Sequence, residues 1–85
     1  MRHRSLIDRG RYREALTVDD EMVAKYPGSA LAHAARGFTR VHLGDFDGAE
    51  ADLTKATELD TSPSAGQLLQ WERDMRRAAR RTPPP

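Results

Sequence analysis

The sequence has no cysteine, and aromatic residues make up only 6% of its 85 positions. Without cysteine, neither a disulfide nor a zinc–thiolate site can supplement the core of so small a domain. No apolar run approaches the roughly 20 residues that cross a bilayer, and no apolar segment of the kind found in secretory signals follows the basic N-terminal residues. These absences predict one small soluble domain, cytoplasmic and without a membrane partner.

Charge is almost balanced overall, at +1, but it is unevenly distributed along the chain. Arginines predominate at residues 1–13 and 71–81, and acids predominate at residues 45–60. Such runs are usually solvated helix faces. The arginines of the last segment could also meet nucleic-acid phosphate or an acidic protein surface, including the acidic segment of a second copy.

Glycine and proline divide the chain into segments of helical length. Gly10, Pro27-Gly28, Gly44 and Thr61-Ser62-Pro63 mark four breaks, because glycine ends helices readily and proline suits their first turn. Between the breaks the apolar residues follow helical spacing, with no alternation typical of strands. The sequence therefore predicts helices at about 2–9, 11–25, 30–43, 46–59 and 63–81, with Ser29, Asp45 and Ser62 as N-caps.

Several features recur at an interval of 34 residues, among them a glycine, an aromatic residue and an alanine, although threonine replaces the second proline. The pairs are Gly10 and Gly44, Tyr12 and Phe46, Ala15 and Ala49, and Pro27 and Thr61. An interval of 34 is the period of a tetratricopeptide helical hairpin. A unit of this kind cannot bury its apolar face alone, so it stacks on its neighbours and presents a surface to other molecules.

Residues 30–60 resemble one complete tetratricopeptide repeat. Gly37 matches the small residue where the two helices cross, and Ala49, Leu53 and Ala56 match positions on the second helix. Residues 10–27 and 64–81 resemble the adjoining halves of neighbouring repeats. The resemblance implies an all-α fold, a short right-handed stack of about five antiparallel helices over residues 1–81, followed by a disordered proline-rich tail at 82–85. It also implies non-catalytic binding of a peptide or helix of a partner protein.

Several positions depart from the family pattern. His33, Arg36 and Arg40 stand where the family favours large apolar or aromatic residues, and Asp19 stands where Leu53 lies one period later. Some members of the family hold a peptide carboxylate with lysine, arginine and asparagine residues. This sequence has no such residues at the corresponding positions. The resemblance therefore carries over a fold and a general role without a binding specificity.

The segment 30–43 allows two orientations. Its apolar residues form one stripe opposite His33, Arg36 and Arg40; the stripe comprises Leu31, Ala34, Ala35, Phe38 and Val41, with His42 at its edge. In the first interpretation the stripe is core and the arginines reach water, because burial of unpaired arginines costs several kcal/mol. In the second, the stripe lines an apolar groove with Phe38 as its anchor.

Asp19 interrupts the apolar stripe of the segment 11–25. An acid in that place requires a partner or access to water. An ion pair with Arg36 or Arg40, an exposed side chain, and a role in ligand binding are the three interpretations that the sequence allows.

The segment 63–81 has an apolar stripe and an arginine face. The stripe comprises Leu68, Trp71, Met75, Ala78 and Ala79, and the face opposite comprises Arg73, Arg76, Arg77 and Arg80. Glu72 and Arg76 form an i,i+4 pair. A basic module that binds nucleic acid through this face is the first alternative function, disfavoured because no aromatic residue lies among the arginines for base stacking.

No spacing in the sequence matches a catalytic, metal-binding or phosphate-binding motif. We therefore expect no enzyme activity and no cofactor or metal. The expected partner is a protein or peptide, with a homodimer, a structural oligomer or a fragment of a longer repeat array as further options. The candidate partner-binding residues are Arg4, Leu31, Phe38, Val41, His42, Glu72 and Arg76.

Overall fold

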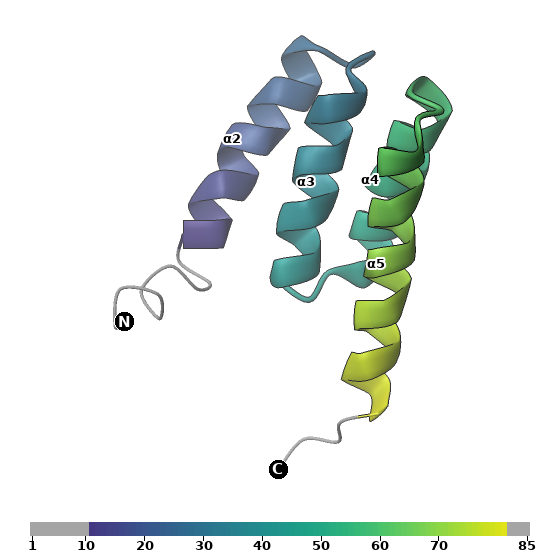
Figure 1. The fold of residues 1–85 in the computed structure, drawn as a ribbon. Coiled ribbons are helices and arrows are strands. Elements are labelled where there is room, and N and C mark those ends of the chain that lie inside the picture. Colours follow the sequence, from purple (N-terminus) through teal and green to yellow (C-terminus); the bar gives the residue numbers. More distant parts are fainter. Residues whose placement is uncertain (1–10, 82–85) are drawn as a thin grey trace, which may run out of the picture.

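A computed structural model of the chain describes residues 11–81, with the backbone alone for Arg81. Within this range the fold is all-α, with four helices and no strand (Figure 1). The helices are α2 (Tyr12–Lys25), α3 (Ala30–His42), α4 (Phe46–Leu59) and α5 (Pro63–Arg81). They agree with four of the predicted helices to within one residue at each end. The predicted helix at 2–9 and the predicted tail at 82–85 lie outside the described residues.

The helix boundaries follow from capping chemistry. The hydroxyl of Ser29 accepts a hydrogen bond from the backbone N–H of Ala32 at 3.1 Å, and the Asp45 carboxylate accepts one from Gly48 at 3.0 Å. These bonds satisfy N–H groups that the first turn leaves unpaired, which confirms two of the predicted N-caps. Between α3 and α4, Gly44 adopts a φ of 83°, a left-handed conformation that glycine accepts without strain.

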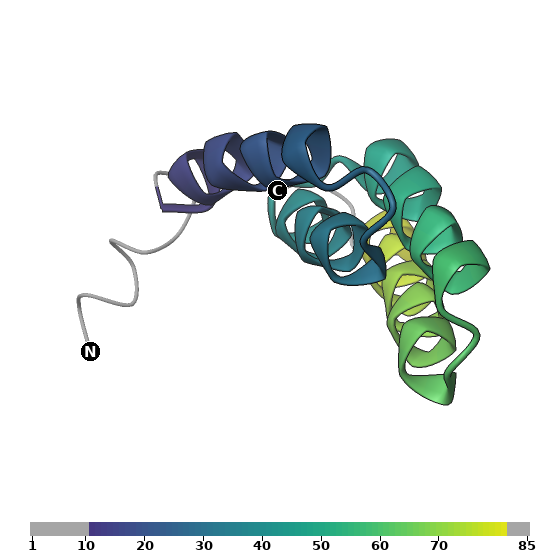
Figure 2. The same cartoon turned by 90° about the horizontal axis from the view of Figure 1, so that it is seen from above.

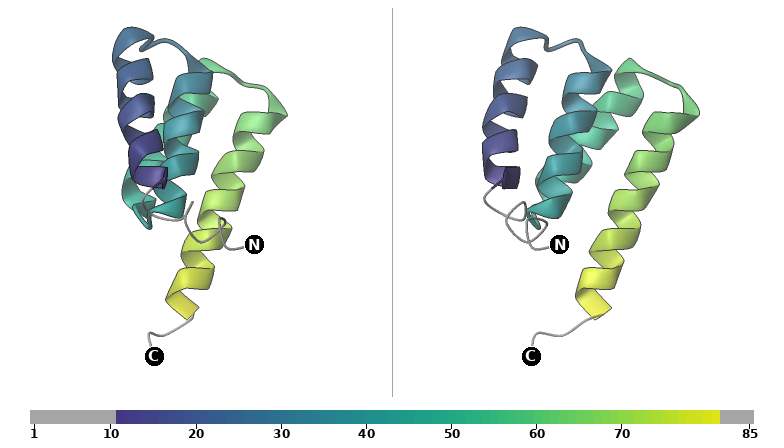
Figure 3. Two further views of the ribbon diagram at one scale, coloured as in Figure 1. Left: turned by 90° about the vertical axis from the view of Figure 1, so that its left-hand side faces the viewer. Right: turned by 60° about the vertical axis from the view of Figure 1, so that its left-hand side comes forward.

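The helices form an antiparallel stack with α3 and α4 in the middle. α3 packs against all three other helices, and α5 packs against α4 and α3. Seen from above, α2 lies at one end of the stack and α5 at the other (Figure 2). The C-terminal part of α5 runs beyond the ends of the neighbouring helices (Figure 3). Each end helix therefore has a side that no described helix covers.

The apolar core is centred on α4. Ala49, Leu53 and Ala56 are almost completely buried, and Gly37 of α3 lies directly against Leu53. This contact confirms the predicted crossing of α3 and α4 at small residues. α2 contributes no buried residue, so the interior depends on three helices.

The orientation of α5 differs from the prediction. Its buried residues are Ala65 and Glu72, whereas Met75 of the predicted apolar stripe is 40% exposed. Arg76, predicted to lie on the opposite face, reaches α4, where it pairs with Asp47 at 3.0 Å. The predicted division into an apolar inner face and an arginine outer face is therefore wrong for Met75 and Arg76, because acids of α4 draw Arg76 toward the stack. Arg73, Arg77 and Arg80 are exposed as predicted.

Candidate partner-binding surface

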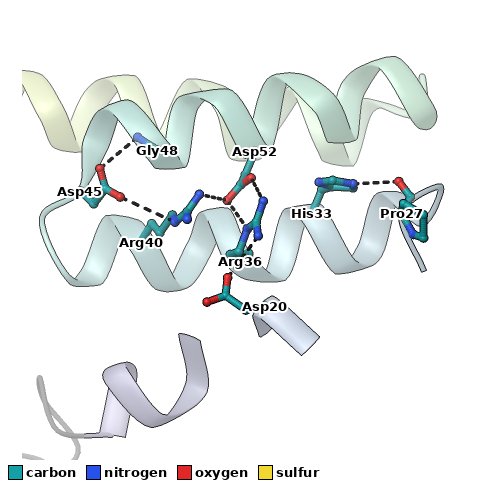
Figure 4. Close-up of polar contacts among 8 residues, drawn as sticks. All are labelled: Asp20, Pro27, His33, Arg36, Arg40, Asp45, Gly48 and Asp52. Atoms are coloured by element: carbon teal, nitrogen blue, oxygen red, sulfur yellow. Dashed lines mark hydrogen bonds and ion pairs between the residues drawn. The ribbon is translucent and has the colours of Figure 1, made fainter. Parts of the chain in front are cut away.

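A buried carboxylate determines which way α3 faces. Asp52 of α4 is 4% exposed and accepts two hydrogen bonds from Arg36, each at 2.9 Å. Arg40, one turn along α3, donates a third at 2.9 Å. Figure 4 shows both guanidinium groups pointing from α3 toward Asp52. The paired two-bond geometry with Arg36 is the strongest arrangement for a guanidinium and a carboxylate.

The ion cluster extends to α2 and to the start of α4. Arg36 also donates to Asp20 of α2 at 3.1 Å, and Arg40 lies 3.6 Å from the Asp45 carboxylate. The hydrogen bond from Arg36 to Asp52 raises the pKa of the guanidinium above its usual value. Each arginine therefore has two acidic partners, and the cluster joins three helices.

This cluster overturns the first interpretation of α3, in which its arginines reach water. Arg36 and Arg40 face the stack, and His33 is buried with its Nε2 atom 2.9 Å from the carbonyl oxygen of Pro27. Burial of an arginine is costly when it is unpaired, and Asp52 supplies the pair. With the polar face inside, most of the apolar stripe of α3 points outward.

The apolar stripe of α3 is consequently a surface. Leu31 is 78% exposed and Phe38 41% exposed, and His42 is also exposed. Val41 is the exception, because it is buried. Near the start of α3 the surface is hollowed into an apolar groove of about 180 Å³; its lining includes Leu31, Ala34, Ala56, Ala65 and Leu68.

Four rings from three helices meet at the other end of the stripe. Tyr12 of α2 stacks on His42 with ring centroids 4.5 Å apart. Phe38 meets His42 edge to face at 4.6 Å and stacks on Trp71 of α5 at 5.2 Å. We refer to Tyr12, Phe38, His42 and Trp71 as the aromatic surface. Its ring contacts hold Phe38 in place.

The predicted partner-binding residues divide into three groups. Leu31, Phe38 and His42 lie together on the exposed side of α3, whereas Val41 and Glu72 lie in the interior. Arg76 is held by α4 and by Glu72, and Arg4 lies outside the described residues.

Sequence reasoning missed Tyr12 and Trp71 as surface residues. Each was assigned to the apolar stripe of its helix. Both rings are half-buried and belong to the aromatic surface. The sequence does not show that the two rings converge, because they lie on different helices. Their convergence depends on how α2 and α5 pack on α3.

The arginines of α5 are largely engaged within the fold. Arg76 contacts Glu72 at 3.1 Å and Glu50 at 3.4 Å in addition to Asp47, and the hydrogen bond that it donates to Glu72 raises the pKa of its guanidinium. Two further pairs are Arg73 with Glu50 at 3.5 Å and Arg77 with Asp74 at 3.4 Å. Acids of α4 and α5 therefore offset much of the positive charge of this face.

Residues 11–81 contain no group of three or more acidic, histidine or cysteine side chains placed to hold a metal ion. In the same part of the chain, no helix combines the length and the apolar composition that crossing a membrane requires. Comparisons with protein-family models, with curated proteins and with solved structures found no match to this chain.

Proposed function

We propose that this chain is a non-catalytic protein-interaction module, a tetratricopeptide-like stack that binds a peptide or helix of a partner protein in the cytoplasm. The observation that carries the proposal is the exposed apolar side of α3, with Leu31 at one end and the aromatic surface at the other. Large apolar side chains that cluster at a surface are typical of interaction sites.

The energetics of this surface favour binding. Covering apolar area stabilises a complex by about 25 cal/mol per Å², and tryptophan and tyrosine are enriched among residues that dominate interfaces. Phe38 is preorganised by its contacts with His42 and Trp71, so little side-chain entropy is lost when a partner covers it. The stripe of α3 contains no acidic residue, lysine or arginine, which suits apolar partner side chains.

Nucleic-acid binding through α5 has weaker support. Phosphate contacts require free cationic side chains, but Arg73, Arg76 and Arg77 each have an acidic partner within the fold. The acids would have to be released before phosphate could bind with full strength.

Affinity capture with matched variants tests the proposal. Proteins captured from a cell extract by the wild-type chain are identified, and the binding of each purified candidate is measured against Phe38→Ala and Leu31→Ala. The control is Leu59→Ala, because Leu59 is a similarly exposed apolar residue but belongs to α4. We expect the first two variants to weaken binding at least about tenfold, a loss of about 1.4 kcal/mol, and the control to bind normally.

Two results would contradict this function. The first is equal binding by wild type, Phe38→Ala and Leu31→Ala. The second is tight binding of a random DNA duplex at physiological salt, with loss of that binding in Arg77→Ala and Arg80→Ala. Sedimentation over a roughly hundredfold range of concentration separates a hetero-partner from a homodimer.

A further inference from the structure

α2 and α4 occupy equivalent places in the 34-residue repeat, but among the helices of residues 11–81 α4 is covered on two sides and α2 on one. Ala49, Leu53 and Ala56 of α4 are almost completely buried beneath α3 and α5. The equivalent residues of α2 are Ala15, Asp19 and Met22, and none of them is buried. Within the described residues, α2 therefore leaves only partly covered the face that its counterpart uses as the centre of the core.

The exposed residues of α2 are of the kind that a helix covers. Val18, Met22 and Tyr26 follow one another at intervals of four along one side, with exposed fractions of 56%, 43% and 47%. We refer to these three residues as the α2 stripe. Intervals of three and four residues make a continuous apolar ridge that can pack against a second helix.

Asp19 adds a chemical requirement to this surface. Its Oδ2 atom is buried but accepts no hydrogen bond from residues 11–81. The nearest predicted partners are occupied, because Arg36 binds Asp52 and Asp20 and Arg40 binds Asp52. The predicted ion pair between Asp19 and either arginine is therefore absent from the described residues. A buried carboxylate oxygen without a donor is costly, so a covering segment gains by bringing one.

The charge of α2 identifies the kind of donor. Between Tyr12 and Lys25 the helix carries four acids and two bases, and three of the acids are consecutive at positions 19–21. Helix α3, which covers the equivalent face of α4, also brings arginines to an acid there: Arg36 and Arg40 pair with Asp52, the residue next to Leu53. A covering helix with a basic residue in its apolar face would form a similar ion pair one position further along the repeat, at Asp19 instead of at the equivalent of Asp52.

We propose that the α2 stripe binds an amphipathic helix of a partner protein, with an arginine or lysine of that helix paired to Asp19. The inference rests on the proposed function, since the occupant is a protein segment, but it concerns a different surface. Apolar residues of the partner cover Val18 and Met22, and its basic residue pairs with the Asp19 carboxylate at the edge of this stripe. The partner helix thus completes the stack on the side of α2.

Three synthetic peptides test the inference with the full chain. Each is a helix of about 18 residues, roughly five turns, with leucine and alanine on one face and glutamine on the other. At the centre of the apolar face the first peptide has arginine, the second glutamine and the third glutamate. Binding is measured by the fluorescence anisotropy of a dye on the peptide. We expect the arginine peptide to bind at least about tenfold more tightly than the glutamine peptide, with the glutamate peptide weakest.

Variants of the chain assign the preference to one carboxylate. Asp19→Asn should remove the preference for arginine, whereas Asp20→Asn, an adjacent and more exposed acid, should retain it. Asp19→Leu, which copies the equivalent Leu53, should bind the glutamine peptide at least as tightly as the arginine peptide. Far-UV circular dichroism confirms that each variant is helical before binding is measured.

The outcomes separate this inference from the proposed function. Equal affinity for the arginine and glutamine peptides, or a preference that survives in Asp19→Asn, would overturn the inference and leave the α3 surface unaffected. Binding of none of the peptides would overturn it as well. Phe38→Ala should bind the arginine peptide normally, because Phe38 belongs to the aromatic surface; if it did not, the two surfaces would be one and the inference would fail.

Discussion

Gly37 and Leu53 are in such close contact that no side chain fits between them. A Cβ atom added at Gly37 would lie 2.7 Å from Cγ of Leu53 and 3.2 Å from the backbone oxygen of Ala49. Leu53 is fully buried and the oxygen belongs to a helix backbone, so neither can move away freely. The distance between α3 and α4 is therefore set by the absence of a side chain at position 37.

Gly37→Ala should destabilise the fold even though alanine favours helices. Overpacking a close contact typically costs about 1–3 kcal/mol, more than the roughly 0.5–1 kcal/mol that replacing a helical glycine by alanine contributes. Gly66→Ala is the matched control, because Gly66 is also helical and has no atom within 4 Å of an added Cβ. Urea denaturation should give a lower midpoint for the first variant and a higher one for the second. Midpoints that rise in both would show that the contact is not tight.

Ala49→Leu should destabilise the domain more than Ala51→Leu. Ala49 is completely buried between helices, whereas Ala51, two residues along the same helix, is exposed. We expect a loss of about 1–3 kcal/mol for the buried position and a change near zero for the exposed one. Thermal unfolding followed by circular dichroism measures both, and coincident curves would be inconsistent with the packing of α4.

Asp52→Ala should cost about 3–5 kcal/mol, because it leaves two arginines inside the stack without their shared partner. Glu58→Ala is the control, an exposed acid of the same helix. A double-mutant cycle of Asp52→Ala with Arg36→Met should show coupling, since the two side chains share two hydrogen bonds of 2.9 Å. Additive effects would mean that the ion pair contributes nothing to stability.

Asp19→Asn should leave stability unchanged or raise it by about 1 kcal/mol, because the Oδ2 atom of Asp19 is buried without a donor. A double-mutant cycle between Asp19 and Arg36 should show no coupling, in contrast with the cycle between Asp52 and Arg36. A loss of several kcal/mol in Asp19→Asn alone would indicate a partner that residues 11–81 do not supply.

The helix boundaries could be predicted because they depend on neighbouring residues. Each boundary is set by a residue within one turn of it: Gly44, Pro63 and the N-caps Ser29 and Asp45. The resemblance to a tetratricopeptide repeat likewise implied the crossing at Gly37, where an added Cβ atom would meet Leu53 and Ala49.

The orientation of α3 could not be predicted in the same way. A helical wheel separates Arg36 and Arg40 from the apolar stripe but does not show that Asp52, 16 and 12 residues away, binds them both. Asp52 appeared to be one surface acid among several in the segment 45–60. The candidate site depends on this long-range pair, because the pair turns Phe38 and Leu31 outward.

Helix α5 presented a similar difficulty. The sequence predicts an i,i+4 pair of Glu72 with Arg76, and that pair forms, at 3.1 Å; Glu72 itself, a predicted partner-binding residue, is buried. Glu72 is buried because α5 turns it toward the stack, while Arg76 extends to acids of α4. The helical spacing of the apolar residues instead predicts that the apolar stripe of the segment 63–81 faces the stack.

Trp71 gives the chain a built-in optical reporter. It is the single tryptophan in the sequence, and its ring lies 5.2 Å from that of Phe38 and 5.7 Å from that of His42. Tryptophan emission responds to the polarity around the indole, so any molecule that displaces water from these rings shifts the spectrum of the unlabelled protein. Binding at the two surfaces can thereby be distinguished in a single sample. Intrinsic tryptophan emission reports binding at the aromatic surface, and a dye on the ligand reports binding at the α2 stripe.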